Sequence, residues 1–145
     1  YPPEGTRGIG GERATTWGQN MAEYVRLANE KILCIPMIES VRAADNIHHL
    51  VKVPGVETFF FGPADFSSSA GFAGQWEGPG IGEQIQAASD IIRQSGKHSG
   101  IIASGAANLA DRKEQGFRMI GLGTDSGFLF NGIRQMLKSI EDSSS

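Results

Sequence analysis

The sequence predicts an α/β fold, and more specifically about half of a (β/α)8 TIM barrel. Four apolar segments of strand character alternate with four helical segments along the chain. Such alternation is typical of a parallel sheet with helices packed outside it, and four strand–helix units are half of the eight that close such a barrel. No GxGxxG or GxxxxGK[ST] motif follows a strand, which disfavours the doubly wound nucleotide-binding folds.

The expected strands are apolar runs, and the expected helices carry apolar residues at helical spacing. We expect strands at 32–38, 58–61, 100–103 and 117–122. Helices are expected at 20–29, 40–51, 79–95, 107–115 and 129–140, with Asp125 capping the last, and a long loop at 62–78. The chain is expected to form one barrel domain over 1–145, with an active-site-side loop at 1–18, strand–helix units at 19–142 and a disordered tail at 143–145.

The composition is that of an ordinary globular protein. Of its 145 residues, 39% are hydrophobic and 20% are charged, with a net charge of −3. No apolar run approaches the ~18 residues that span a bilayer, and no basic patch indicates a nucleic-acid partner. Cys34 is the single cysteine, so an internal disulfide is excluded. Because Cys34 lies in an apolar run, its thiol is expected to be buried. We therefore expect a cytoplasmic protein without a membrane or nucleic-acid partner.

Two neighbouring expected strands end on a carboxylate. Glu39 follows the first strand, and Asp65 follows the second after Gly62-Pro63-Ala64. Because function in a barrel gathers at the carboxyl ends of the strands, we expect the two acids at one end of the sheet. Paired carboxylates suit a hard divalent cation, and without one their repulsion would favour protonation of either acid. The alternatives are an N-cap role for Asp65 and a strand-end salt bridge for Glu39.

Gly62-Pro63-Ala64-Asp65 has a second use. A strand that ends in Gly-Pro and enters a helical turn exposes successive backbone N–H groups, which can hold a carboxylate or phosphate oxygen. A simple turn is the alternative.

Four motifs carry a resemblance to a known family. They are Tyr1-Pro-Pro-Glu-Gly-Thr-Arg7-Gly8, Arg13-Ala14, Met37-Ile38-Glu39-Ser40 and Phe61-Gly62-Pro63-Ala64-Asp65-Phe66-Ser67. In this order, over nearly the whole chain, the sequence resembles the HpcH/HpaI aldolase/citrate lyase family. The family commonly has Gln-Ile-Glu in place of Met37-Ile38-Glu39 and Asp-Leu-Ser in place of Asp65-Phe66-Ser67. Neither departure touches a metal-binding group. Phe66 and the loop at 71–78, which holds Trp76 and Glu77, are expected to give the pocket a different shape from that of other members.

The resemblance implies the second half of a barrel of the phosphoenolpyruvate/pyruvate-binding type and a class II, metal-dependent aldolase. Members such as 2-dehydro-3-deoxyglucarate aldolase and 4-hydroxy-2-oxo-heptanedioate aldolase cleave 2-keto-3-deoxy or 4-hydroxy-2-oxo acids to pyruvate and an aldehyde through a metal-stabilised enolate. By this resemblance Glu39 and Asp65 bind the metal, Mg²⁺ first, with Mn²⁺ or Co²⁺ as alternatives. The substrate-binding residues would be Gly62, Pro63, Ala64, Asp65 and Ile102.

Within that site, the N–H groups of Ala64 and Asp65 would hold the carboxylate of pyruvate. Ile102 would supply an apolar wall, for which a purely hydrophobic filler is the alternative.

The resemblance also implies parts that the chain lacks. The catalytic His and the pyruvate-binding Arg of the family lie upstream, and the chain opens on Tyr1 with no strand before it. We therefore expect a piece of a longer polypeptide, no catalytic residue in this segment, and an isolated segment that is inactive. His48, His49 and His98 do not match the family His and are expected in surface or core roles. Arg7 and Arg13 match family positions and are expected in ion pairs.

The last helix tends in this family to swap onto a neighbouring subunit, so the resemblance implies a homo-oligomer. Two alternatives stay open. One is a lyase of the citrate lyase β type that acts on a CoA thioester, and the other is a non-catalytic fragment that needs the other half of the barrel.

Overall fold

The computed structural model describes residues 1–76 and 78–143, apart from the side chains of Ala106 and Ala107. The chain divides into two compact units, Tyr1–Cys34 and Ile35–Ser145. The expectation of one domain over 1–145 stays a prediction. Among the described helices, none combines the length and the apolar character that crossing a membrane requires.

The first unit holds a short 3₁₀ helix, Arg13–Thr15, and helix α1, Met21–Lys31. Thr15 organises the loop before α1, because its buried hydroxyl donates to the carbonyls of Gly10 and Glu12 at 3.0 Å each. Asn20 occupies the N-cap position of α1, but its side chain makes no capping hydrogen bond there. The segment at 1–18, expected to be an irregular loop, is thus partly ordered by its own polar contacts.

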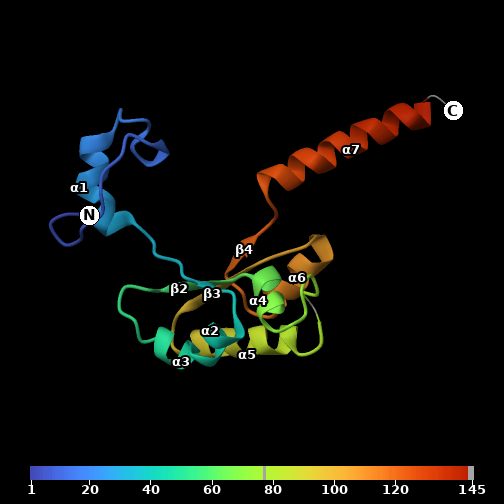
Figure 1. Cartoon of the computed structure of the whole chain (residues 1–145), viewed down its shortest axis with the longest axis horizontal. Coiled ribbons are helices and arrows are strands. Elements are labelled where there is room, and N and C mark those ends of the chain that lie inside the picture. Colours follow the sequence, from blue (N-terminus) through green and yellow to red (C-terminus); the bar gives the residue numbers. More distant parts are fainter. Residues whose placement is uncertain (77, 144–145) are drawn as a thin grey trace. The chain divides into compact units, whose positions relative to one another are not determined.

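The second unit is built on a four-stranded parallel sheet in the order β1-β2-β3-β4 (Figure 1). Its strands are Met37–Ile38, Thr58–Phe61, His98–Ile102 and Met119–Gly121. Strands that are consecutive in sequence are neighbours in the sheet, as in a (β/α)8 barrel. The predicted parallel sheet with strand–helix alternation is confirmed.

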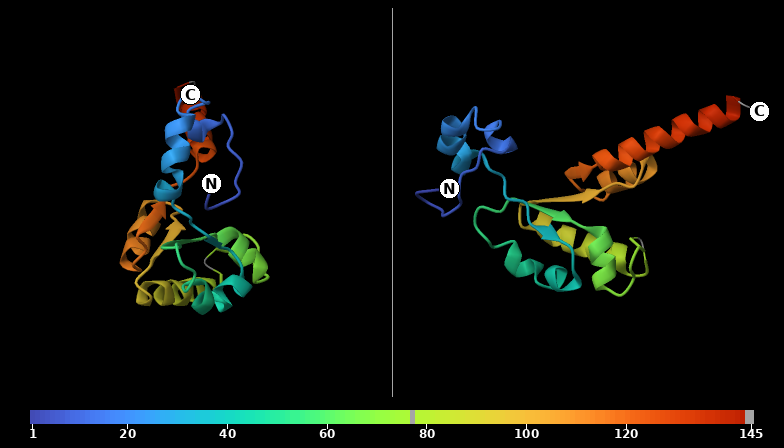
Figure 2. Two further views of the ribbon diagram at one scale, coloured as in Figure 1. Left: turned by 90° about the vertical axis from the view of Figure 1, so that its left-hand side faces the viewer. Right: turned by 45° about the horizontal axis from the view of Figure 1, so that its top comes forward.

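Six helices accompany the sheet in the described part of this unit: α2 (Val41–Asp45), α3 (Ile47–Leu50), α4 (Pro63–Ser69), α5 (Ile81–Gln94), α6 (Ala106–Glu114) and α7 (Asp125–Ser143). Helices α2, α3 and α5 lie side by side along one face of the sheet (Figure 1 and Figure 2). Helix α2 begins just after the carboxyl end of β1, and α4 begins just after the carboxyl end of β2. These two junctions position the candidate site.

The hydrophobic core lies between the sheet and these helices. Alternate residues of the strands point from the sheet toward these helices and into the core. Helix α5 contributes the apolar stripe that the sequence predicted. The buried members of the core are Ile38, Ile47, Val56, Phe59, Phe61, Phe66, Ile81, Ile85, Ala88, Ile92, Ile101 and Phe117. Full burial of one such large side chain stabilises the fold by about 1.5–3 kcal/mol. A buried hydrogen bond, 2.7 Å between the hydroxyls of Ser89 and Ser99, also joins α5 to β3.

The other face of the sheet is partly open. Phe60 is half-buried and Met37 is 52% exposed there. A Cβ atom on Gly100 would lie 2.7 Å from Cδ2 of Phe60, so the phenyl ring needs a glycine on the neighbouring strand. In a closed barrel this face becomes the interior.

The first strand is shorter than predicted. Only Met37–Ile38 pair as β1, whereas Ile32, Leu33 and Cys34 are exposed. Pro36 explains the limit, because it has no N–H to donate to a ladder, although its carbonyl accepts from the Phe60 N–H at 2.9 Å. The prediction of a buried Cys34 thiol is wrong for the same reason, since the segment before Pro36 is not a core strand.

Several helix bounds also differ from those predicted. The helix expected at 40–51 is broken at Asn46 into α2 and α3, and the helix expected from Pro79 begins at Ile81 after Gly80, which has a φ of 77°. The cap of α7 is Thr124, whose Oγ1 accepts from the Gly127 N–H at 3.1 Å, and not Asp125.

The expected disordered tail overlaps α7 at Ser143. Its other two residues, 144 and 145, lie outside the described residues.

Candidate functional site

The candidate site is formed where β1 and β2 end side by side. Glu39 follows the last residue of β1, and Gly62 follows the last residue of β2. The ladder continues one step beyond the strands, because the Gly62 N–H donates to the Ile38 carbonyl at 3.2 Å. This hydrogen bond brings Glu39 alongside Gly62, at the carboxyl edge of the sheet.

Glu39 lies against Gly62. A Cβ atom on Gly62 would be 3.2 Å from Cβ of Glu39, 3.4 Å from Oε2 of Glu39 and 3.1 Å from the terminal methyl of Met37. The backbone of Gly62 has φ −103°, which other residues also adopt. The position is therefore constrained by close approach and not by its backbone angles, and this approach places the Glu39 carboxylate near the N-cap residue of α4.

Asp65 is the third residue of α4. The N-cap of this helix is Gly62, and Pro63 occupies the first position, so Asp65 is not the N-cap that one alternative proposed. Asp65 and Ala64 are both exposed. The first N–H groups of a helix have no partner within it, and a carboxylate in the first turn is favoured by the helix dipole. The start of α4 therefore combines an accessible acid with accessible N–H donors.

The two acids have chemistry that fits a hard cation. In the described residues, neither Glu39 nor Asp65 takes part in an ion pair. No group of three or more His, Cys, Asp or Glu side chains is clustered for metal binding in the described residues. A cation held by these two carboxylates would thus complete its coordination with water and ligand oxygens, as Mg²⁺ commonly does.

Of the other residues expected around the site, Ile102 lies at the same edge of the sheet and Trp76 lies in the loop after α4. Ile102 is the last residue of β3, half-buried, and its Cγ1 would be 3.6 Å from a Cβ on Gly121 of the neighbouring strand. It lies at the same edge of the sheet as Glu39. Trp76 is half-buried, and Glu77 lies outside the described residues.

The three histidines lie away from this edge. His48 and His49 are exposed on α3, and His98 is exposed at the first residue of β3, the opposite end of that strand. Arg7 places its guanidinium 5.7 Å from the ring centroid of Tyr1, a cation–π contact in place of the expected ion pair. Arg13 lies exposed in the 3₁₀ helix.

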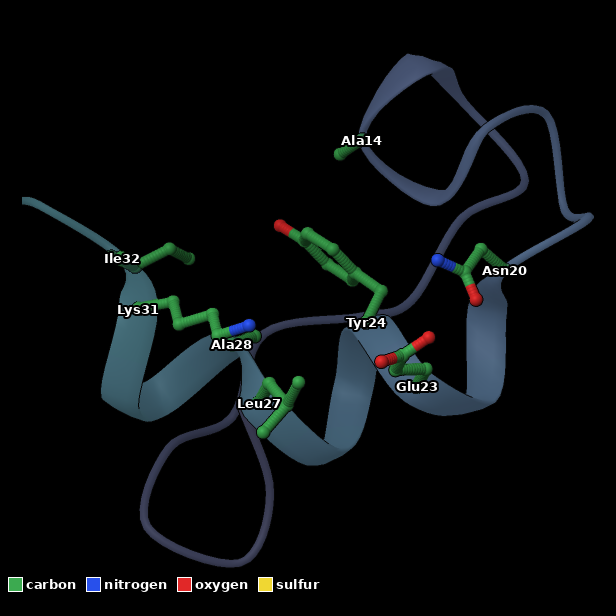
Figure 3. Close-up of a pocket in the computed structure, with 8 residues that line it drawn as sticks. All are labelled: Ala14, Asn20, Glu23, Tyr24, Leu27, Ala28, Lys31 and Ile32. Carbon is green, nitrogen blue, oxygen red and sulfur yellow. The ribbon is translucent and has the colours of Figure 1, made fainter.

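A cavity of about 280 Å³ in the first unit contains none of these site residues (Figure 3). Figure 3 shows the ring of Tyr24 standing above α1, with Glu23 and Lys31 on the same helix. The Tyr24 hydroxyl lies 3.3 Å from that of Tyr1, and this hydrogen bond raises the pKa of Tyr24. None of the residues predicted for the site lines this cavity, so we place the candidate site at the sheet edge.

The fold and the sheet edge together define a class, that of (β/α)8-barrel proteins with acidic groups at the carboxyl ends of the strands. Comparison with known proteins makes this specific. The model of the HpcH/HpaI aldolase/citrate lyase family matches residues 1–132, and the chain belongs to that family.

Two curated relatives illustrate the similarity. The hydroxypyruvate/pyruvate aldolase of Chromohalobacter salexigens is 35% identical over 131 residues, which are 89% of this chain and 51% of that protein. The 4-hydroxy-2-oxo-heptane-1,7-dioate aldolase of Salmonella typhimurium is 35% identical over 134 residues, 91% of this chain and 51% of that protein. The chain therefore spans about half the length of these curated relatives.

A crystal structure of a family protein from Burkholderia cenocepacia superposes with a TM-score of 0.79 at 30% identity, covering 97% of this chain and 56% of that one. The predicted family is confirmed, as is the predicted fold, a portion of a (β/α)8 barrel.

The assignment of Glu39 and Asp65 to a metal site stays a prediction, and the sequence analysis missed the closeness of Glu39 to Gly62. The signal that was available is the glycine itself, directly after a strand whose neighbour ends one residue before an acid.

Proposed function

We propose that this chain carries the metal- and pyruvate-binding edge of a carbon–carbon lyase. The reaction would cleave 2-keto-3-deoxy or 4-hydroxy-2-oxo acids to pyruvate and an aldehyde. The observation that carries the proposal is the approach of the Glu39 carboxylate to Gly62 at the start of α4, the helix that bears Asp65. Family membership and relatives named as aldolases support it.

Glu39 and Asp65 would hold a divalent cation, with Mg²⁺ as the first candidate. When bound, such a cation supplies Lewis-acid chemistry that stabilises negative charge on the 2-oxo oxygen of the substrate. The two carboxylates contribute a charge of −2, which favours a divalent over a monovalent ion. Their exposure leaves room for substrate and water oxygens.

The N–H groups of Ala64 and Asp65 would hold the substrate carboxylate, and Ile102 would limit the site on the β3 side. The reaction itself is a retro-aldol cleavage. The proton leaves the 4-hydroxyl, the C3–C4 bond breaks, and its electron pair forms the pyruvate enolate while C4 leaves as the aldehyde. A proton then returns to C3 to give pyruvate. The N–H donors would orient the substrate through its carboxylate. Negative charge then develops on the 2-oxo oxygen, and stabilisation of such charge is usually the largest contribution to catalysis.

The base that takes the hydroxyl proton has no candidate among the described residues of this edge, because His48, His49 and His98 lie elsewhere. We therefore propose that this chain by itself binds metal and pyruvate but turns over slowly or not at all. We also propose a homo-oligomer in which α7 packs against a neighbouring subunit.

The first test removes the charge of each acid in the full 145-residue chain. Glu39→Gln and Asp65→Asn should each weaken Mn²⁺ binding, measured by electron paramagnetic resonance, by at least roughly 10–100-fold, the range known for lesser changes around metal sites. Glu83→Gln, an exposed acid on α5, is the matched control and should bind Mn²⁺ like the wild type. Wild-type affinity in both site variants would refute the metal site.

The second test concerns the reaction class. A polypeptide that contains this chain and shows activity should release pyruvate from a 4-hydroxy-2-oxo acid, measured with a coupled lactate dehydrogenase assay. Release of acetyl-CoA from a CoA thioester, without pyruvate release, would instead establish the citrate lyase β type. Glu39→Gln or Asp65→Asn should abolish the metal-dependent cleavage in either case, since both place charge stabilisation at this edge.

A further inference from the structure

We propose that Ser69 is a positioning residue that fixes the distance between the segment bearing Glu39 and the helix bearing Asp65. The inference rests on the proposed function and deepens it. It concerns a hydroxyl that would touch neither metal nor substrate, and it starts from a hydrogen bond across 28 residues of sequence, from the Val41 N–H to Oγ of Ser69, 3.0 Å long.

This hydrogen bond joins the two acidic segments directly. Val41 is the first residue of α2, two positions after Glu39. Ser69 is the last residue of α4, four positions after Asp65. Residues four apart lie on the same side of a helix, one turn along, so Ser69 and Asp65 share a face of α4. A displacement of α4 relative to α2 would therefore move Asp65 relative to Glu39.

The Ser69 bond has a counterpart on the other side of the acids. The Gly62 N–H donates to the Ile38 carbonyl at 3.2 Å, one residue before Glu39 and three residues before Asp65. Glu39 thus lies between the two bonded positions on one segment, and Asp65 lies between those on the other. Together the two bonds close a ring of chain that contains both acids, so the backbone segments that carry them are tied to each other.

The hydroxyl of Ser69 is oriented to accept a hydrogen bond from Val41. Its own hydroxyl donates to the Phe66 carbonyl at 2.8 Å, which aims the oxygen lone pairs away from α4. The Val41 N–H is one of the donors at a helix start that have no partner within the helix. Ser40 already caps α2 from within its own segment, by accepting from Ala43 at 3.2 Å. The contact with Ser69 is therefore not needed to start α2, and its distinct effect is to link the two helices.

The neighbouring serine provides a matched control. Ser68 is also exposed on α4, and its hydroxyl donates to the Ala64 carbonyl within the same helix at 2.9 Å. Ser68→Ala and Ser69→Ala remove the same atom from adjacent positions of one helix, and alanine suits a helix at both. Only the second substitution removes the link to α2. Ser69→Thr keeps a hydroxyl and serves as the conservative variant.

The experiment measures two quantities in the full 145-residue chain. The first is hydrogen exchange of the Val41 amide by NMR without metal, and the second is the dissociation constant for Mn²⁺. In Ser69→Ala we expect Val41 to exchange faster and Mn²⁺ to bind roughly fivefold more weakly, the factor that corresponds to loss of about 1 kcal/mol. Ser68→Ala should match the wild type in both, and Ser69→Thr should restore both. A urea unfolding curve for each variant shows whether the change is confined to the site.

Two results would overturn the proposal while leaving the proposed function intact. One is an unchanged Val41 exchange rate in Ser69→Ala, which would mean that the hydrogen bond does not protect Val41. The other is faster exchange together with wild-type Mn²⁺ affinity, which would mean that the link does not set the geometry of the acids. Failure of the proposed function looks different, because Glu39→Gln and Asp65→Asn would then leave Mn²⁺ binding unchanged, and that result would remove the positioning role with it.

Discussion

Gly62 determines how closely the two acidic segments can approach. A Cβ atom on residue 62 would lie 3.1 Å from the terminal methyl of Met37, 3.2 Å from Cβ of Glu39 and 3.4 Å from Oε2 of Glu39. A contact at such distances forces the neighbour to move by a few tenths of an ångström. A metal site is sensitive to shifts of that size, because ligand distances must lie within about 0.2 Å of their preferred values. The glycine therefore belongs to the proposed site although it offers no side chain.

This predicts a specific effect of Gly62→Ala. The φ of −103° at this position is open to alanine, so the free energy of unfolding should change by less than about 1 kcal/mol. Displacement of Glu39 should nevertheless weaken Mn²⁺ binding roughly tenfold, within the range for residues that orient metal ligands. The measurement is Mn²⁺ titration followed by electron paramagnetic resonance, alongside urea unfolding.

Gly8→Ala is the control, because an added Cβ there meets nothing within 4 Å. It should leave both the affinity and the stability unchanged. Equal Mn²⁺ affinities for wild type and Gly62→Ala would show that Glu39 is not held by this contact.

At the level of single residues, the sequence predicts that Glu39 and Asp65 follow neighbouring strands, but not the contacts that surround them. Glu39 and Asp65 could be placed at one edge because each follows an apolar run, and parallel strands end together. The fit of Glu39 against Gly62 depends on the register of β1 against β2, which is set by backbone hydrogen bonds between distant segments. The hydrogen bond between Ser69 and Val41 could not be predicted for the same reason, since the two residues are 28 positions apart in sequence.

Among the elements, the contact between α5 and β3 contains a polar pair in an apolar setting. Ser89 and Ser99 have no exposed surface, and their hydroxyls are 2.7 Å apart. Each satisfies the other, so replacing one leaves a buried hydroxyl without this partner. Such a group costs about 1–3 kcal/mol, whereas replacing both partners by apolar groups can be nearly neutral.

We therefore expect non-additive effects at this contact. Ser89→Ala and Ser99→Ala should each lower the free energy of unfolding by about 1–3 kcal/mol, and the double variant should lose less than the sum of the two. Urea denaturation of the four proteins measures the difference. Strict additivity would show that the two hydroxyls do not depend on each other.

Elements with strong apolar signals were predicted well. The bounds expected for β2 are those of the structure, and the stripe Ile81, Ile85, Ala88 and Ile92 is the buried face of α5. Weak signals failed. Helix α4 is only seven residues long and ends in three serines, so its sequence lacks an apolar period and resembles a loop. The apolar run before Pro36 has strand composition, but no N–H at Pro36 to continue a ladder.

At the scale of the whole molecule, the sheet has two edge strands. β1 and β4 each pair with one neighbour in the described structure, whereas a closed barrel has no edges. The exposed Met37 and the half-buried Phe60 lie on the face that a barrel would enclose. The chain spans about half the length of the curated relatives it matches.

Helix α7 presents an exposed apolar surface. None of its residues, all of which the structure describes, is buried, and its large apolar side chains are between 48% and 68% exposed. They are Phe128, Leu129, Phe130, Ile133, Met136, Leu137 and Ile140. Leu129, Ile133 and Leu137 recur every four residues and so form one stripe. Exposed apolar patches of this kind mark interaction surfaces, which supports the proposed packing of α7 against a second copy.

The proposed packing predicts the oligomeric state of α7 variants. Leu129→Glu combined with Ile133→Glu places two charges on the stripe, and burying them against a second copy would cost several kcal/mol. The double variant should therefore sediment as a smaller species than the wild type in analytical ultracentrifugation at equal concentration. Asn131→Glu combined with Gln135→Glu adds the same charge to the same helix outside the stripe, so it should sediment like the wild type. Identical sedimentation of all three proteins would show that the stripe does not hold copies together, and an equal loss in both variants would attribute the effect to charge on α7 and not to its apolar face.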